Sequence, residues 1–154
     1  SQPYMVALMT QWLDVGPGDS VLEIGTGSGY QAAVLACLAR RVVTVERHAA
    51  LSAAAEALLK DLGFGNVRFV VGDGTLGWDD EAPYDRIMVT AGSPSVPESL
   101  RRQLAVGGRL VVPVGGRDMQ RLEAYRRSES GFDRAESVEC RFVPLIGEEG
   151  WRRG

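Results

Sequence analysis

The 154-residue sequence has little of the chemistry that metal-dependent or membrane proteins use. It contains a single histidine and two cysteines, Cys37 and Cys140, which have no metal-type neighbours and cannot complete a zinc site. We therefore expect no metal, and expect both cysteines to be buried as small hydrophobic residues. No stretch approaches the roughly 18 consecutive apolar residues that a membrane-spanning helix needs, and no signal peptide is visible. These absences favour a cytoplasmic protein without a membrane partner.

An excess of positive charge is also lacking. The formal net charge is −3, whereas a nucleic-acid-binding domain is usually basic, so we expect no nucleic-acid partner. The hydrophobic content of 45% is that of an ordinary globular protein. Because repeats, low-complexity tracts and linkers are also missing, the sequence predicts a single domain over residues 1–154.

The most informative stretch begins with an apolar run, Val21–Ile24, which predicts a buried parallel strand and contains one acid, Glu23. Gly25, Gly27 and Gly29 follow at alternate positions, and a helical pattern comes next. A strand, a glycine turn and a helix together bring bare backbone and a helix N-terminus against a ligand. The spacing differs from G-x-G-x-x-G, and a carboxylate at Glu23 would repel a pyrophosphate, which favours a cationic or hydroxyl-bearing ligand. The alternative is a tight strand–helix connection without a ligand.

Two further acids follow the next two predicted strands. Glu46 ends the strand 41–46, 21 residues after Gly25, where a ribose diol is bound in nucleotide-binding folds. Asp73 lies between two glycines after the strand 67–71. Each has a plainer interpretation, Glu46 as a charge favouring the next helix and Asp73 as a turn residue. Three acids at three successive strands nevertheless indicate a nucleoside site. His48 is expected to be a surface or capping residue.

The remaining patterns complete an alternating βα order. Ser1 is a candidate N-cap for a helix whose apolar stripe packs on the core, and Gly63 is expected to end a helix over 49–62. That helix has one face made of Leu51, Ala54, Leu58 and Leu62. Further helices are predicted at 30–40 and 97–103, and further strands at 84–90, 109–114, 120–127 and 137–144, the last two joined by a hairpin turn at 128–131. The order predicts an α/β fold: a doubly wound, mostly parallel seven-stranded sheet with helices on both faces and an antiparallel C-terminal hairpin.

Four segments resemble the class I S-adenosylmethionine (SAM)-dependent methyltransferases, and within them the protein-L-isoaspartate O-methyltransferase family. They are Ser1–Tyr4, Val21–Gln31, Val71–Gly74 with Gly77–Trp78, and Arg141–Leu145. The glycine segment is shared by many methyltransferases, whereas the first and last are more specific to this family. The resemblance covers about residues 1–147 and implies the Rossmann-like class I methyltransferase fold.

The resemblance implies methyl transfer from SAM, which becomes S-adenosyl-L-homocysteine, to the free carboxyl of L-isoaspartyl residues in proteins and peptides. The methyl ester would then collapse to a succinimide, which begins repair. The implied active-site residue is Ser1, which would orient the substrate carboxylate. The implied cofactor-binding residues are Glu23, Gly25, Thr26, Gly27, Ser28, Gly29, Gln31, Glu46, Arg47, Gly72, Asp73 and Gly74. The implied substrate-binding residues are Gln2, Thr90, Ala91, Arg141, Phe142, Val143 and Pro144. We expect a monomer.

The sequence departs from the family's pattern in two places, and rival functions remain. Family members usually carry an additional N-terminal segment before the Ser1–Tyr4 position, and often have alanine at Gly92. One rival is a class I methyltransferase acting on a dedicated peptide, a small molecule or a nucleic acid, although the residues 90–94 lack the Asn/Asp-Pro-Pro-aromatic signature of amino-directed nucleic-acid enzymes. A nicotinamide-dependent dehydrogenase is disfavoured by the glycine spacing and Glu23. A non-catalytic SAM-binding module would keep the three acids but lack a peptide cleft.

Overall fold

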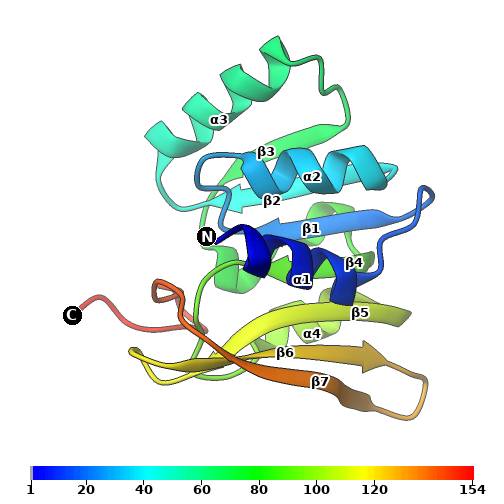
Figure 1. Cartoon of the computed structure of the whole chain (residues 1–154), viewed down its shortest axis with the longest axis vertical. Helices are drawn as coiled ribbons and strands as arrows, with labels where there is room; N and C mark the ends of the chain where they lie inside the picture. The colour runs from blue at the N-terminus through cyan, green and yellow to red at the C-terminus, as the bar shows by residue number, and fades with distance from the viewer. Residues whose placement is uncertain (1) are drawn as a thin grey trace.

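The computed structural model describes residues 2–154, so the predictions made for Ser1 lie outside the described residues. Helices and strands alternate through the first two thirds of the chain and give way to a run of strands (Figure 1). In order they are α1 (Pro3–Leu13), β1 (Ser20–Ile24), α2 (Tyr30–Leu38), β2 (Arg41–Glu46), α3 (Ala49–Asp61), β3 (Val67–Val71), the short 3₁₀ turns η1 (Gly74–Leu76) and η2 (Asp79–Glu81), β4 (Tyr84–Val89), α4 (Glu98–Gln103), β5 (Leu104–Gly115), β6 (Gln120–Arg127) and β7 (Phe132–Cys140).

The strands form one seven-stranded sheet in the order β3-β2-β1-β4-β5-β6-β7. β1 to β5 pair in parallel, while β6 and β7 pair antiparallel to their neighbours. This confirms the predicted mostly parallel sheet with an antiparallel C-terminal hairpin. β1 is paired with β2 on one side and β4 on the other, so the strand order reverses there. In open α/β sheets, a ligand crevice forms at the carboxyl ends of the strands at this point.

Helices cover both faces of the sheet, as predicted. Met9 and Leu13 of α1 and Leu35 of α2 share one apolar cluster with the sheet, and Figure 1 shows α1, α2 and α3 on this same face. Leu100 of α4 belongs to the cluster on the opposite face. Within residues 2–154, no helix combines the length and apolar character that crossing a membrane would require.

The burial prediction for Cys37 is wrong, and the leucine-bearing face of α3 is not the buried one. Leu51, Leu58 and Leu62 share a face of α3, but this face is exposed, and α3 packs through Ala55 and Leu59 instead. α3 is rich in alanine, so the positions of its large leucines do not identify its buried face. That face is set by the close approach of the start of α2, where a Cβ at the N-cap residue Gly29 would lie 3.1 Å from Ala55. Cys37 is exposed because α2 buries a different face, made of Gln31, Ala32, Leu35 and Ala36, whereas Cys140 is buried as predicted.

Several predicted boundaries also differ. The N-cap of α1 is Gln2 rather than Ser1, and Gln2 makes no side-chain capping bond. β5 begins at Leu104 rather than 109, because Gly107, with φ of +83°, is accommodated as an irregularity within the strand. β7 covers 132–140 rather than 137–144. Residues 141–144 leave the sheet and run beside the segment after β4, where Pro144 bridges Gly92.

Candidate cofactor and substrate site

The loop between β1 and α2 depends on glycine for its conformation. Gly25, Gly27 and Gly29 all have positive φ values of 98°, 52° and 85°, which side chains other than glycine rarely adopt. A Cβ at Gly25 would lie 2.4 Å from the Thr90 hydroxyl oxygen, whereas nothing lies within 4 Å of a Cβ at Gly27. The loop is therefore packed tightly against the end of β4 on one side and presents bare backbone on the other.

Glu46 ties this loop to the end of β2. Its side chain is buried, and its two carboxylate oxygens accept hydrogen bonds from the Gly27 amide at 3.1 Å and the His48 amide at 3.0 Å. Each carboxylate oxygen has a second lone pair that can accept another hydrogen bond. Because Glu46 also lines a cavity, it can receive a pair of neighbouring hydroxyl groups there.

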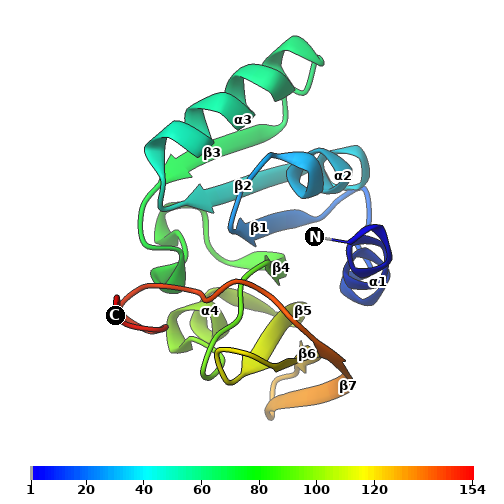
Figure 2. The same cartoon turned by 60° about the vertical axis from the view of Figure 1, so that its left-hand side comes forward.

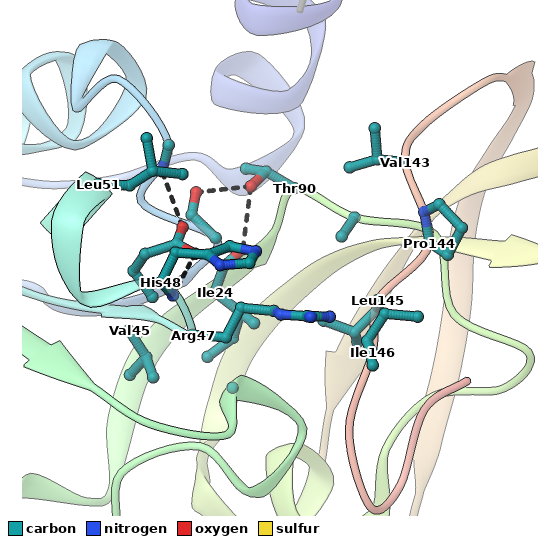
Figure 3. Close-up of a pocket in the computed structure, with 15 residues that line it drawn as sticks. Ile24, Val45, Arg47, His48, Leu51, Thr90, Val143, Pro144, Leu145 and Ile146 are labelled. Atoms are coloured by element: carbon teal, nitrogen blue, oxygen red, sulfur yellow. Dashed lines mark hydrogen bonds between the residues drawn. The ribbon is translucent and has the colours of Figure 1, made fainter. Parts of the chain in front are cut away.

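This cavity, of about 410 Å³, lies at the carboxyl ends of β1, β2 and β4 (Figure 3). One side comes from the glycine loop and the start of α3, and the other from the segment after β7. In Figure 3 the exposed Arg47 side chain reaches from the first side toward Leu145 and Ile146. The residues that line the 410 Å³ cavity are Ile24, Gly25, Gly27, Val45, Glu46, Arg47, His48, Leu51, Gly74, Thr90, Ala91, Val143, Pro144, Leu145 and Ile146. We call Val143–Ile146 the substrate-side wall.

A second, larger cavity of about 1080 Å³ lies between α1, the glycine loop and α2. It shares Gly25, Gly27 and Thr90 with the first cavity, so the two meet at the glycine loop. Three of the predicted cofactor-binding residues lie on this side, namely Thr26, Ser28 and Gln31. The side-chain amide of Gln31 donates a hydrogen bond to the Thr10 hydroxyl of α1 at 3.1 Å, which joins the two helices that flank this cavity.

Glu23 lies beneath the glycine loop rather than on either cavity. It is fully buried and accepts a hydrogen bond from Thr44 at 2.6 Å, and Thr44 in turn is 2.6 Å from Thr26. Its other oxygen has no hydrogen-bond partner among the described residues. Burial raises the pKa of Glu23 to about 8, and the nearby Glu46 adds to this, while the Thr44 hydrogen bond acts in the opposite direction. Glu23 is therefore mostly neutral at pH 7, and the argument that its charge would repel a pyrophosphate does not apply.

Asp73 is already engaged by the protein. One carboxylate oxygen accepts from the Thr75 amide and hydroxyl at 2.9 and 2.7 Å, and the other accepts from the Glu148 amide at 2.8 Å. Gly74 lines the 410 Å³ cavity, while Gly72 and Asp73 line a neighbouring one of about 300 Å³. Contact between Asp73 and a cofactor stays a prediction.

The substrate-binding predictions fall into two groups. Thr90, Ala91, Val143 and Pro144 line the 410 Å³ cavity. The other three lie away from it: Arg141 is exposed and donates to the Asp118 carbonyl, Phe142 packs in the core beside α1, and Gln2 is exposed at the start of α1.

Five lining residues, all apolar except His48, were not predicted from the sequence. They are Ile24, Val45, His48, Leu51 and Ile146. The signal that could have found most of them is position, since they lie at or directly after the carboxyl ends of β1 and β2. No cluster of three or more histidine, cysteine or acidic side chains among residues 2–154 could hold a metal ion.

A sheet whose parallel strands reverse order at β1, with a glycine loop after β1, an acid at the end of β2 and an antiparallel C-terminal hairpin, is the arrangement of a class I methyltransferase domain. The sequence model of one family, protein-L-isoaspartate(D-aspartate) O-methyltransferase (PCMT), matches residues 1–150. The chain belongs to this family.

Individual relatives agree with this assignment. The chain is 54% identical to a protein-L-isoaspartate O-methyltransferase from Magnetococcus marinus, over 98% of this chain and 67% of that protein. A solved protein-L-isoaspartate O-methyltransferase is 36% identical with a TM-score of 0.89, over 97% of this chain and 49% of the other. A Plasmodium falciparum structure ascribed to the same family, in complex with S-adenosyl-L-homocysteine, is 26% identical with a TM-score of 0.75, over 95% of this chain and 75% of the other. The chain thus spans about two thirds of the first relative and half of the first structure.

Proposed function

We propose that the protein transfers a methyl group from SAM to the free α-carboxyl group of L-isoaspartyl residues in proteins and peptides. Membership of the family supports methyl transfer to a carboxyl group as the reaction, and the names of the relatives support an isoaspartyl residue as the substrate. The observation that carries the proposal is the Glu46 carboxylate, held by the Gly27 and His48 amides at the edge of an apolar cavity. This arrangement suits a nucleoside diol with a second ligand beside it.

The residues of the site are suited to SAM. The Plasmodium relative was solved with S-adenosyl-L-homocysteine, the product of SAM. In this chain Glu46 would accept hydrogen bonds from the ribose hydroxyls, Gly25 and Gly27 would allow the amino-acid part to lie against bare backbone, and apolar Leu51 would flank the base. When bound, SAM supplies an electrophilic methyl group attached to a sulfonium.

The protein has little acid–base chemistry to perform. An α-carboxyl group has a pKa near 3.5 and is already ionised at pH 7, so the nucleophile needs no general base. The chain must instead align the carboxylate with the methyl group and exclude water, and such positioning can supply roughly 7–11 kcal/mol of the barrier. Thr90 lies where the two cavities meet, and its hydroxyl donates to the Ile24 and Gly25 carbonyls at 3.0 and 2.8 Å. It thereby holds the glycine loop at the meeting point of cofactor and substrate.

The backbone amide nitrogen of the next residue would then attack the carbonyl carbon of the methyl ester formed on the isoaspartyl carboxyl. The bond to the methoxy group breaks, methanol leaves with the amide proton, and a succinimide forms without further help from the protein. We propose that Ser1 orients the substrate carboxylate, so that Ser1→Ala lowers turnover and leaves SAM affinity nearly unchanged. Equal losses in turnover and affinity would contradict that role.

The proposal extends to the setting of the reaction. We propose that residues 1–154 act as a single catalytic domain, as a monomer in the cytoplasm, on isoaspartyl proteins and peptides rather than on nucleic acid or membranes. The net charge of −3 supports the exclusion of nucleic acid.

The test is methyl transfer from labelled SAM to two matched peptides that differ only in an isoaspartyl or aspartyl linkage. We expect label on the isoaspartyl peptide alone, released by mild base as methanol. SAM binding without label on either peptide would instead indicate a dedicated substrate or a non-catalytic SAM-binding module.

A further inference from the structure

A tight turn at 147–151 follows directly after the substrate-side wall. The Trp151 amide donates to the Leu145 carbonyl at 2.8 Å, and the Gly147 amide donates to the Trp151 carbonyl at 3.1 Å. The Trp151 indole also donates to the Gly92 carbonyl at 3.1 Å. The turn therefore folds back on the wall and on the segment that follows β4. Figure 2 shows this C-terminal segment, in red, passing the region of η1 and α4.

The loop after β3 holds the backbone of this turn. The Glu148 amide donates to Asp73 at 2.8 Å, and the Glu149 amide donates to the Thr75 hydroxyl at 3.1 Å. The fit is close, since a Cβ at Gly147 would lie 2.1 Å from an Asp73 oxygen. These bonds explain why the Asp73 carboxylate faces the turn, an arrangement that the sequence motif did not indicate.

The Glu149 side chain makes a second attachment. Its two carboxylate oxygens accept hydrogen bonds from the amide and the hydroxyl of Ser99, at 2.9 and 2.7 Å, at the start of α4. Ser99 is buried, and Glu149 is partly buried. The neighbouring Glu148 side chain is exposed and makes no hydrogen bond within the described part of the chain. Two adjacent glutamates thus differ sharply in their contacts.

We call Asp73, Thr75, Ser99 and Glu149 the latch. The latch joins two sides of the 410 Å³ cavity, because Gly74 lies between the first two latch residues and the substrate-side wall directly precedes the turn. We propose that Glu149 is a positioning residue for the peptide substrate: by fixing the turn to α4, it holds the substrate-side wall at a set distance from the cofactor loop. This inference rests on the proposed function for its substrate.

The Glu149 side chain bonds Ser99 and touches neither Glu46 nor the glycine loop. Asp73, the latch residue also implied in cofactor binding, keeps its own bonds to Thr75 and the Glu148 amide, which predicts a separation of effects. Loss of the Glu149 carboxylate leaves the cofactor residues in place but loosens the wall. We therefore expect a higher KM for the peptide with little change in cofactor affinity. A hydrogen bond to a charged group corresponds to roughly tenfold or more in an equilibrium constant, which sets the expected size of the effect.

The experiment compares Glu149→Gln with Glu148→Gln, a matched control with the same chemical change one residue away. Peptide KM and kcat are measured by methyl transfer, and the dissociation constant of S-adenosyl-L-homocysteine by calorimetry. We expect Glu149→Gln to raise peptide KM about tenfold and to leave the dissociation constant within about twofold, while Glu148→Gln behaves as wild type. An unchanged peptide KM, or a parallel loss of cofactor affinity, would overturn the proposal. Should Glu149→Gln fold poorly, Ser99→Ala removes the hydroxyl bond to Glu149 and keeps the amide bond, so a smaller change with the same split is expected.

Hydrogen exchange tests the latch independently of the reaction. The Gly92 amide donates to the Val143 carbonyl at 2.7 Å, and the Leu145 amide donates to the Gly92 carbonyl at 2.8 Å. We expect both amides to exchange faster in Glu149→Gln but not in Glu148→Gln. Unchanged exchange would refute the latch. If Glu149→Gln exchanges faster but the wild-type protein methylates neither the isoaspartyl nor the aspartyl peptide, the proposed function is refuted while the latch is supported.

Discussion

Replacing Glu23 with glutamine should remove a specific pH dependence of stability. Burial raises the pKa of Glu23 in the folded protein from 4.5 to about 8. In the unfolded chain the proton leaves above about pH 4.5, whereas the folded protein keeps it until about pH 8, so the folded state binds more protons in this window. The contribution of Glu23 to stability is therefore fully present below about pH 4.5 and is lost as the pH rises through about 8. The free energy of unfolding should fall by about 1.4 kcal/mol per pH unit between these limits.

The assay is urea unfolding of wild type and Glu23→Gln at about pH 5.5, 6.5 and 7.5, comparing the difference between the two proteins at each pH. Glutamine keeps the acceptor for Thr44 but does not titrate, so any constant cost of the amide cancels. We expect wild type to lose roughly 2–3 kcal/mol relative to the variant over this range. Glu56→Gln, a change at an exposed position on α3, should leave the slope of wild type unaltered. A difference that stays constant with pH, or changes in the opposite direction, would refute a buried neutral Glu23.

Three further predictions concern the site and its support. Glu46→Ala should weaken binding of S-adenosyl-L-homocysteine by about 10- to 100-fold in calorimetry, because the carboxylate is the proposed acceptor for the diol; unchanged affinity would show that the diol binds elsewhere. Gly25→Ala should lower the free energy of unfolding by at least about 2 kcal/mol, because of its positive φ and the Thr90 contact, while Gly65→Ala, whose Cβ meets nothing, should change it by less than about 0.5 kcal/mol; equal effects in denaturant titrations would contradict the strain. Leu59→Ala should cost about 2–5 kcal/mol and Leu58→Ala less than about 0.5 kcal/mol in the same titrations, and the reverse order would contradict burial of α3 through Leu59.

The first half of the fold follows from local sequence signals. Val21–Ile24 is apolar except for Glu23 because its strand is buried on both faces, and β2 and β3 begin and end at the predicted residues. Alternation of strand and helix then fixes parallel pairing, and parallel pairing brings the end of β1 and Glu46 to one edge of the sheet. For the same reason the position of Glu46 beside the glycine loop could be predicted from the sequence, while the binding of a cofactor there stays a prediction.

The substrate side was less predictable because it depends on contacts distant in sequence. Residues 141–144 are apolar enough to suggest a strand, but Pro144 pairs with Gly92 outside the sheet. Asp73 has the expected position, yet its carboxylate faces Glu148, a residue far along the chain. Ile146 lines the cavity only because this C-terminal segment returns across the strand ends, and no periodicity reports such a crossing.

The proposed function is that this site methylates an isoaspartyl carboxyl group as the first step of repair. The most direct measurement follows the mass of an isoaspartyl peptide over time in the presence of the protein and SAM, beside its aspartyl counterpart. The account predicts that the isoaspartyl peptide first gains a methyl group and then loses methanol to give a succinimide, while the aspartyl peptide does not change. A methyl group that stays in place after mild base, or equal methylation of both peptides, would contradict it.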